Sequence, residues 1–347
     1  MKRLISLKFL VAIGILTALA AMPVSAQVRG GPGLEIAIAA QERHTNSLMA
    51  NPQVVGTGVG LNAEGEPAVI IFTETQRGGF PRTLDGVPVV VRQSGRIYAL
   101  PKCNNPPCGG GGGGGEETID RTARFERPVP IGVSTGHPDI TAGTIGARVT
   151  DGTNVYALSN NHVYADENQA DIGDAVVQPG AYDGGSSPAD DIGTLASFVP
   201  IVFSTSANNT VDAAVALSST ADLGNSTPSN GYGTPRSIPT QVSINQKVKK
   251  YGRTTGLTTG SVYAVNATVN VGYSTGVARF VNQIVIQPGG FSGGGDSGSL
   301  IVVDGKGRNS GDDRRAVGLL FAGSAFFTIA NPIDAVLDRF GVAIDGE

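Results

Sequence analysis

The chain has 347 residues, with 25 lysines and arginines against 29 aspartates and glutamates and a formal net charge of −4. This acidic balance argues against nucleic acids and anionic membranes as partners, because both require a basic face. The sequence also holds 50 glycines but only three histidines and two cysteines, so a motif framed by glycines is only moderately specific here.

Residues 1–26 have the features of a secretory signal peptide. Three basic residues precede an apolar run over residues 9–21, and the small residues VSA at 24–26 predict cleavage before Gln27. The run is short for a membrane span, and no cysteine follows the cleavage point to take a lipid anchor. We expect an exported protein, periplasmic or secreted, with no stable membrane anchor and a mature net charge of about −7. A retained N-terminal anchor is the alternative.

Residues 27–100 are predicted to form a small α+β domain. A helix is expected over residues 34–50, ended by Asn51 and Pro52. Three strand-like apolar runs follow, QVVGTGVGL, AVIIFTET and VPVVVRQ, with a turn at residues 62–65 between the first two. About seventy residues can fold alone, although with marginal stability.

Residues 101–127 form a linker rich in cysteine, proline and glycine. Cys103 and Cys108 are close in sequence and the protein is expected to be exported, which favours a local disulfide closed by the intervening prolines. Metal binding by this pair is the weaker interpretation, because no histidine or further cysteine lies nearby. The glycine run at 109–115 is expected to act as a flexible tether and marks a domain boundary.

Residues 128–347 are dominated by strand-sized apolar runs between clusters of Gly, Asn, Asp and Ser, among them IGARVT, NVYALS, GTLASFV, FVNQIVIQ and AVGLLF. Few long helical patterns interrupt them, so we expect an all-β barrel or sandwich. The segment from Asn331 and Pro332 to Phe340, followed by Gly341, predicts a capped C-terminal helix.

A candidate nucleophile lies in GGGDSGSLIV at residues 293–302, where Ser297 stands between glycines and an aspartate before an apolar strand. Glycines let the backbone bend so that N–H groups converge beside an exposed hydroxyl, which is typical of an acyl-transfer site. A hairpin turn is the alternative explanation of this motif.

A serine becomes nucleophilic when a neutral imidazole accepts its proton. His162 ends the strand-like run at 154–166, whereas His44 lies in the expected helix and His137 in a polar loop. We therefore select His162 as the base. Taken alone, it could equally be a polar residue at the end of a strand.

The imidazole in turn needs a carboxylate to hold its tautomer. Asp212 is embedded in the apolar segment TVDAAVAL, where an unpaired acid would be costly to bury. Asp190 and Asp191 lie instead in a loop rich in Pro, Ser and Gly, where water can solvate them. Asp212 is thus the expected orienting acid, with a turn residue at a strand entry as the alternative.

Together, and in this order, His162, Asp212 and Ser297 resemble the catalytic triad of the chymotrypsin-like (trypsin-fold) serine proteases, in the form found in exported bacterial members. GDSGS at 295–299 is similar to the nucleophile loop, LSNNHV at 158–163 to the histidine segment, and VGLLFAG at 317–323 to the strand that walls the specificity pocket. The resemblance covers residues 128–342. It implies two six-stranded-type antiparallel β-barrels, one with His162 and Asp212 and the other with Ser297, and a C-terminal helix.

The resemblance also implies a serine endopeptidase that acts on protein or peptide substrates through an acyl-enzyme, without a cofactor or metal. The backbone N–H groups of Gly295 and Ser297 are then expected to form the oxyanion hole. Many exported proteases of this fold carry an N-terminal pro-region, so residues 27–100 are interpreted as a pro-domain in contact with the protease domain. A substrate-binding or surface-binding module is the alternative.

The sequence also departs from the family pattern. Phe291 stands where trypsin-type enzymes carry an acid, and with Phe321 and Gly323 it predicts an apolar or small specificity pocket. Asp296 corresponds to an acid that pairs with a newly exposed N-terminus, but Arg127 precedes Pro128 and nothing clearly supplies such a terminus.

Other functions remain open at this point: a triad-bearing esterase, a self-processing protein, or a catalytically silent β-barrel used for binding. The acidic loop with Asp183, Asp190 and Asp191 is expected to be solvated, because its spacing matches no recognised calcium loop.

Overall fold

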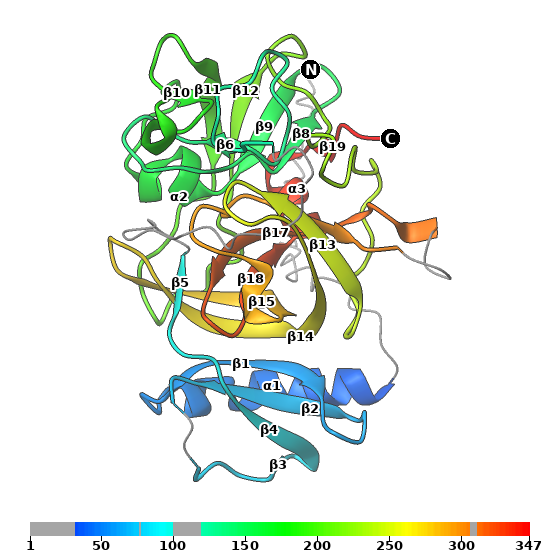
Figure 1. The fold of residues 1–347 in the computed structure, drawn as a ribbon. Coiled ribbons are helices and arrows are strands. Elements are labelled where there is room, and N and C mark those ends of the chain that lie inside the picture. Colours follow the sequence, from blue (N-terminus) through cyan, green and yellow to red (C-terminus); the bar gives the residue numbers. More distant parts are fainter. Residues whose placement is uncertain (1–31, 76–77, 100–118, 306–310) are drawn as a thin grey trace, which may run out of the picture.

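The computed structural model of the protein describes residues 32–75, 78–99, 119–305 and 311–347. Two β-rich lobes lie one above the other, and a smaller N-terminal unit adjoins the lower lobe (Figure 1). The predicted signal peptide, the Cys103–Cys108 disulfide and the glycine tether lie outside the described residues. No helix within the described ranges is both long and apolar enough to cross a membrane.

The upper lobe contains a six-stranded antiparallel sheet in the order β10-β11-β12-β9-β8-β19. Its strands are β8 (Ala147–Thr150), β9 (Val155–Ser159), β10 (Ala175–Val177), β11 (Asp191–Phe198), β12 (Ala214–Ser218) and β19 (Ala343–Ile344). A two-stranded pair, β6 (Ser134–Thr135) and β7 (Gly143–Thr144), lies beside it, with the short helical turns α2 (Asn161–Tyr164), η1 (Asp166–Asn168) and η2 (Ala181–Asp183). Successive strand residues face opposite sides of the sheet and build two cores: Ala157 and Leu195 pack on one side, and Leu158 and Val215 pack on the other together with residues of the C-terminal helix.

The lower lobe is a closed six-stranded barrel. The pairing order β13-β16-β17-β18-β15-β14 returns to its start through a direct β13–β14 pairing, and the neighbours are antiparallel. The strands are β13 (Lys247–Gly252), β14 (Gly256–Gly272), β15 (Val277–Gln287), β16 (Leu300–Val303), β17 (Ala316–Gly323) and β18 (Thr328–Pro332), with the turn η3 (Gly289–Phe291) before β16. Asn266 and Asn282 have left-handed backbones, with φ of 49° and 60°. These left-handed residues lie at irregularities in the pairing of β14 with β15, and such β-bulges bend a hairpin. Strand β14 extends beyond the barrel.

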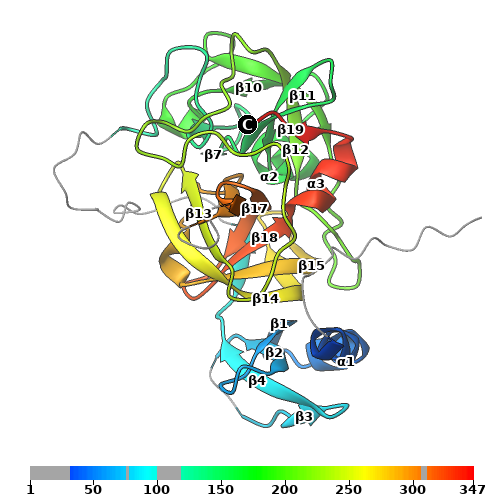
Figure 2. The same ribbon diagram turned by 90° about the vertical axis from the view of Figure 1, so that its right-hand side faces the viewer.

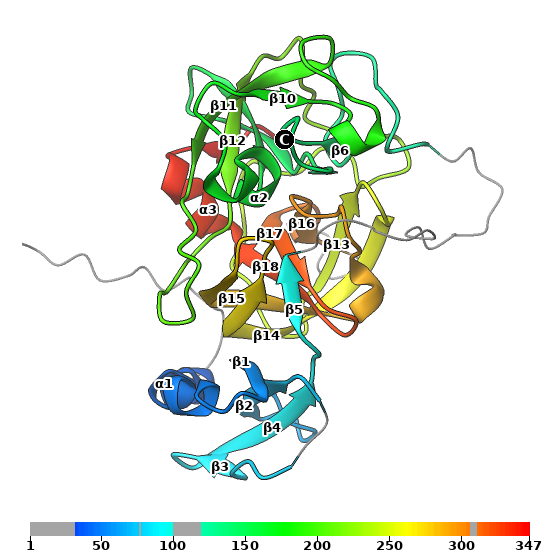
Figure 3. The same cartoon turned by 90° about the vertical axis from the view of Figure 1, so that its left-hand side faces the viewer.

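The N-terminal unit continues the sheet of the lower lobe. It consists of helix α1 (Pro32–Met49) and strands β1 (Val54–Leu61), β2 (Pro67–Thr73), β3 (Thr83–Leu84), β4 (Val87–Gln93) and β5 (Ile97–Ala99). Strand β1 pairs with β14, and residues of α1 share a hydrophobic core cluster with residues of the barrel. Figures 2 and 3 show α1 on one side of this added sheet, while β5 rises from it toward the lower lobe.

The prediction of an all-β fold with two barrel-like lobes, a C-terminal helix and a small α+β N-terminal unit is confirmed. The C-terminal helix α3 (Ile333–Phe340) ends at Gly341, whose φ of 63° fits a left-handed cap that donates its N–H to the Leu337 carbonyl. At its start Pro332 is the N-cap, and no side chain caps the helix.

Candidate active site

His162 and Asp212 are in direct contact in the upper lobe. His162 lies in α2 immediately after β9, and Asp212 lies just before β12, which pairs with β9 so that Ser159 faces Ala214. The imidazole Nδ1 lies 2.6 Å from Oδ2 of Asp212, and the His162 backbone N–H donates to Oδ1 at 3.3 Å. A carboxylate oxygen accepts hydrogen bonds, so Nδ1 carries the proton of this contact, and in the neutral imidazole Nε2 then keeps its lone pair.

Asp212 is fully buried and is held from both lobes. In the upper lobe, the side-chain amide of Asn160 donates to its backbone carbonyl at 2.8 Å. From the lower lobe, the side-chain oxygen of Asn331 accepts its backbone N–H at 3.0 Å, and the Tyr273 hydroxyl donates to its Oδ2 at 2.9 Å. The acid is therefore fixed in backbone and side chain.

The position of Asn331 explains why it does not cap α3. Its amide nitrogen donates to Oε1 of Gln283 at 2.7 Å, and Gln283 in turn donates to the carbonyl of Thr210. A buried amide pairs with the polar groups around it. Here those groups belong to the segment that carries Asp212.

Ser297 lies in the lower lobe, in the loop before β16, and only 1% of its surface is exposed. Its carbonyl accepts the N–H of Thr144 in the upper lobe at 2.8 Å. A Cβ placed on Gly143 would lie 2.6 Å from the Val163 side chain and 3.1 Å from the Ser297 carbonyl oxygen. The Ser297 backbone is therefore close to the residue that follows His162.

The hydroxyl of Ser297 does not bond to the imidazole in this structure. It donates to the Phe321 carbonyl at 3.4 Å. Within the described part of the chain, Nε2 of His162 is buried and has no hydrogen-bond partner. The structure thus brings together His162 and Asp212 and places Ser297 on an adjoining segment, without the serine–histidine hydrogen bond.

The backbone amide of Gly295 is oriented by the peptide that precedes it. The carbonyl of Gly294 accepts a hydrogen bond from the Thr254 hydroxyl at 2.5 Å. In a trans peptide the following N–H points the opposite way, so the Gly295 N–H is directed away from Thr254. Gly295 has φ of +92°, and a Cβ there would lie 2.7 Å from Oγ1 of Thr254, so both conformation and space require glycine.

The backbone N–H of Ser297 is oriented in the same way, by the peptide that precedes it. The Asp296 carbonyl accepts the Ser299 hydroxyl at 2.6 Å and its backbone N–H at 3.0 Å, which turns the Ser297 N–H away from them. Neither the Gly295 N–H nor the Ser297 N–H has an acceptor among the described residues. Both amides are therefore free to donate to an added acceptor, and their role as an oxyanion hole stays a prediction.

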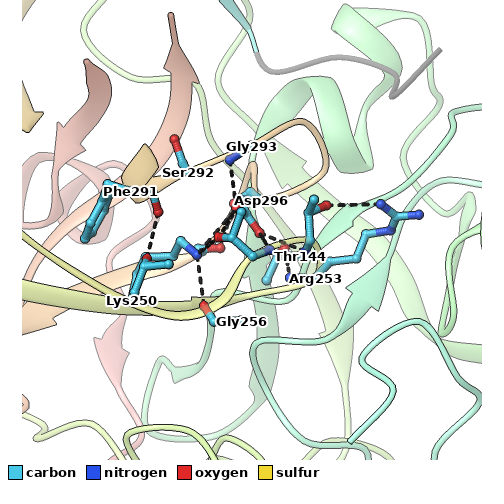
Figure 4. A network of polar contacts seen from close by, with 12 residues as sticks. Thr144, Lys250, Arg253, Gly256, Phe291, Ser292, Gly293 and Asp296 are labelled. Atoms are coloured by element: carbon cyan, nitrogen blue, oxygen red, sulfur yellow. Dashed lines mark hydrogen bonds and ion pairs between the residues drawn. The ribbon is translucent and has the colours of Figure 1, made fainter. Parts of the chain in front are cut away.

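Beneath this loop lies a buried ion pair between Asp296 and Lys250 (Figure 4). The ammonium lies 3.4 Å from Oδ2, both side chains are fully buried, and Lys250 also donates to the Gly256 carbonyl at 2.9 Å. The carboxylate accepts the Thr255 hydroxyl at 2.6 Å and the Gly293 N–H at 2.9 Å. Burial alone raises the pKa of Asp296, but the charge of Lys250 and these hydrogen bonds outweigh it and hold the pKa below its usual value.

Asp183 and Asp190 of the acidic loop are paired with arginines, and both side chains are buried, so the expectation that water solvates them is wrong. Asp183 receives two hydrogen bonds from the guanidinium of Arg253, at 2.7 and 2.5 Å, and Asp190 also receives two from Arg124, one of them at 2.7 Å. Across the described ranges, no group of three or more His, Cys, Asp or Glu side chains is placed to hold a metal ion. The loop is therefore tied to its surroundings by ion pairs.

The residues predicted to line a specificity pocket lie in or beside the lower core. Phe291 is 1% exposed, with the Lys250 ammonium 5.9 Å from its ring, and the Phe321 ring packs on Phe280 at 4.8 Å. Gly323, at the end of β17, pairs with Tyr98 of β5. The two rings thus contribute to the core, and β5 covers the edge at Gly323.

Two functional candidates were not foreseen in the sequence, Lys250 and Tyr273. Lys250 lies in a polar-looking run, QKVKKYG, where only the inward alternation of the strand distinguishes it from its exposed neighbour Lys247. Tyr273 lies in a turn-rich stretch whose approach to Asp212 depends on the packing of one lobe on the other.

Comparisons with known proteins found one matching family model and several similar solved structures. The family model of the Nal1 C-terminal domain matches residues 235–329, and no curated protein matches the sequence. A glutamic acid specific serine protease superposes with a TM-score of 0.45 at 23% identity, covering 62% of this chain and 100% of that one. Thermobifida fusca protease A gives 0.44 at 19% identity, with 63% and 100% covered, and Nocardiopsis protease gives 0.43 at 16%, with 62% and 99%. The similar solved structures are bacterial serine proteases with a chymotrypsin-like fold.

Proposed function

We propose that this protein is an exported serine endopeptidase. The observation that carries the proposal is the buried hydrogen bond of 2.6 Å between Nδ1 of His162 and Asp212. The other ring nitrogen of His162, Nε2, has no partner among the described residues, and the Ser297 segment lies nearby. The two unpaired amides of Gly295 and Ser297 support it, because tetrahedral intermediates of acyl transfer need such donors.

The proposed mechanism assigns one role to each group. After rotating away from the Phe321 carbonyl, Ser297 Oγ attacks the scissile carbonyl carbon while Nε2 of His162 accepts its proton. The imidazolium is stabilised by Asp212, and the amides of Gly295 and Ser297 bind the oxyanion. Collapse of the intermediate breaks the C–N bond as His162 returns the proton to the leaving amine; water then releases the acyl group by the same steps.

The test has two stages. A fluorophosphonate is expected to label the wild-type protein at Ser297 and to leave Ser297→Ala unlabelled, as seen by peptide mass spectrometry. Absence of labelling in both the wild type and a variant with β5 detached, Ile97→Asp, would support a silent β-barrel. A diverse peptide library and a panel of esters then separate an endopeptidase from an esterase, and the N-terminus of the exported protein is expected at Gln27.

We further propose that the N-terminal unit acts as a pro-domain that covers the candidate site. The supporting observation is strand β5, which runs antiparallel to the end of β17, with Ala99 opposite Ala322 and Tyr98 opposite Gly323. The preceding residue of β17, Phe321, accepts the hydrogen bond of Ser297. An extended peptide that adds to this edge lies next to the nucleophile, and β5 already takes that place.

Single substitutions in β5 test this role in the full chain. Ile97 is buried and faces the core, whereas Tyr98 is exposed. Ile97→Asp is expected to detach β5 and to raise the rate of peptide cleavage and of Ser297 labelling, while Tyr98→Asp serves as the matched control with the charge in solvent. Equal rates for both variants and the wild type would contradict a covering role and favour a binding module.

A further inference from the structure

One tyrosine from the lower lobe touches both members of the His162–Asp212 pair. The hydroxyl of Tyr273 donates to Oδ2 of Asp212 at 2.9 Å, and this same oxygen accepts the Nδ1 hydrogen of His162. The Tyr273 ring stands edge-on to the imidazole, with centroids 5.9 Å apart and an interplanar angle of 71°. The side chain therefore contacts the acid by a hydrogen bond and the base by its ring.

We propose that Tyr273 is a positioning residue for catalysis, whose hydroxyl fixes the Asp212 carboxylate and, through it, the orientation of His162. This inference rests on the proposed serine endopeptidase function. It assigns to the lower lobe a direct part in orienting a base and an acid that both belong to the upper lobe.

The first argument is that the buried carboxylate of Asp212 needs hydrogen-bond donors. A buried carboxylate is costly unless hydrogen bonds compensate the lost water. Within the described residues, the side-chain oxygens of Asp212 receive three hydrogen bonds, two from His162 and one from Tyr273. Tyr273 is therefore the donor that is independent of the histidine, and it holds Oδ2 in place when the imidazole changes its charge.

The second argument is that the hydroxyl remains a donor. Burial, followed by the negative charge of Asp212, raises the pKa of Tyr273 well above its usual value. His162 and Tyr273 are the titratable groups hydrogen-bonded to Asp212 in the described part of the chain. The tyrosine thus stays protonated wherever the imidazole can act as a base.

The third argument is that Tyr273 is itself held in place. Its ring packs against Phe203 at 5.6 Å and Phe280 at 6.1 Å, and its backbone N–H closes a turn on the Gly276 carbonyl at 2.7 Å. Few rotamers of a large ring fit such surroundings. The hydroxyl is therefore preorganised toward Asp212.

The turn that carries Tyr273 is also anchored to the upper lobe by Glu167. The carboxylate of Glu167 accepts the Ser274 N–H at 3.1 Å, the Ser274 hydroxyl at 2.8 Å and the Thr275 N–H at 2.8 Å. Burial alone raises the pKa of Glu167, but these hydrogen bonds outweigh it and lower the pKa, which keeps the acceptor charged.

The backbone around Glu167 is unusual and is stabilised by its neighbours. Asp166, Glu167 and Asn168 have φ of 44°, 54° and 75°, a left-handed conformation that costs free energy outside glycine. Asn168 exchanges hydrogen bonds with the side chain of Asn161, at 2.7 and 3.1 Å. Asn161 precedes His162, so the strained turn that presents Glu167 is built onto the histidine segment.

Tyr273→Phe tests the proposal, because it removes only the hydroxyl. We measure the rate of fluorophosphonate labelling at Ser297 from pH 5 to 9 in the full chain. Loss of a hydrogen bond to a charged group is expected to slow labelling by about tenfold or more. Without the Tyr273 hydroxyl, the negative charge on Oδ2 of Asp212 is less compensated and stabilises the imidazolium of His162 more strongly. The pH of half-maximal labelling is therefore expected to rise. The downfield proton-NMR signal of the His162 Nδ1 hydrogen is expected to shift.

Tyr263→Phe is the matched control. It removes another hydroxyl from the same hairpin, one that accepts a hydrogen bond from Arg92 at 2.8 Å, and it is expected to leave the pH of half-maximal labelling unchanged. Where Tyr273→Phe lowers the unfolding midpoint below the assay temperature, Glu167→Ala keeps the hydroxyl but releases the turn and is expected to act in the same direction.

The outcomes separate the two proposals. Absence of labelling in both the wild type and Ile97→Asp contradicts the protease function. A labelled wild type whose rate, pH profile and Nδ1 signal are all retained in Tyr273→Phe contradicts the positioning role alone. A slower rate with an unchanged pH profile and signal also contradicts it, because a purely structural defect lowers the rate without changing the charge at Asp212.

Discussion

Replacement of Lys250 by methionine removes one charge from the buried pair beneath the Ser297 loop and keeps a side chain of similar length. Asp296 would retain hydrogen bonds from Thr255, Gly293 and Thr254, all between 2.6 and 3.2 Å. Breaking a buried ion pair from one side costs about 3–5 kcal/mol, because the remaining charge is left without compensation. The remaining hydrogen bonds favour the lower end, so we expect a loss of about 3 kcal/mol, or about a hundredfold in the unfolding equilibrium.

The assay is urea unfolding followed by circular dichroism, since the chain contains no tryptophan. Lys247→Met, an exposed position on the same strand, is the control and is expected to stay within about 0.5 kcal/mol of the wild type. The loss in Lys250→Met should shrink toward pH 4, because a protonated Asp296 needs no counterion. A loss of less than 1 kcal/mol at pH 7, or a loss that is the same at both pH values, would refute the reasoning.

Three further predictions concern other contacts. Gly295→Ala places a Cβ 2.7 Å from Oγ1 of Thr254 and is expected to slow fluorophosphonate labelling about a hundredfold, whereas Gly65→Ala, at a similar φ of +84° but in open space, should leave labelling unchanged. Gln41→Ala removes one of the two side-chain partners of Thr57 and of Asn266, which keep Thr45 and Glu42, and is expected to cost about 1 kcal/mol in urea unfolding; no change would show that this contact is dispensable. Because the pKa of folded Asp296 lies below its usual value, its stabilisation is present above about pH 4 and lost as the pH falls through the folded pKa. Asp296→Asn should therefore flatten the stability profile between pH 5 and 2, and a profile as steep as that of the wild type would contradict this.

The sequence predicted those parts of the site that depend on local pattern. Ser297 stands in a glycine-framed turn before an apolar strand, and His162 ends a strand, so both could be found from their neighbours in the chain. Asp212 was selected because an acid among valines and alanines needs a partner when buried. The structure supplies that partner in His162.

Residues whose role depends on distant packing could not be found in this way. Lys250 differs from an ordinary surface lysine only because the closing of the barrel buries it against Asp296. Asn331 has the residue type of a helix cap, but its place in β18 directs its amide to the backbone of Asp212. In each case the local propensity was outweighed by a buried polar partner from elsewhere in the chain.

The added sheet of the N-terminal unit has a consequence for processing. One edge of β14 pairs in succession with β13, β1 and β5, while α1 shares its apolar contacts with the barrel. Cutting the polypeptide between the N-terminal unit and the two lobes would break one covalent link and leave these contacts in place. A nicked protein should therefore co-purify as two fragments and come apart only in denaturant, so that separating the two lobes from the proposed pro-domain requires degradation of the smaller fragment as well as cleavage.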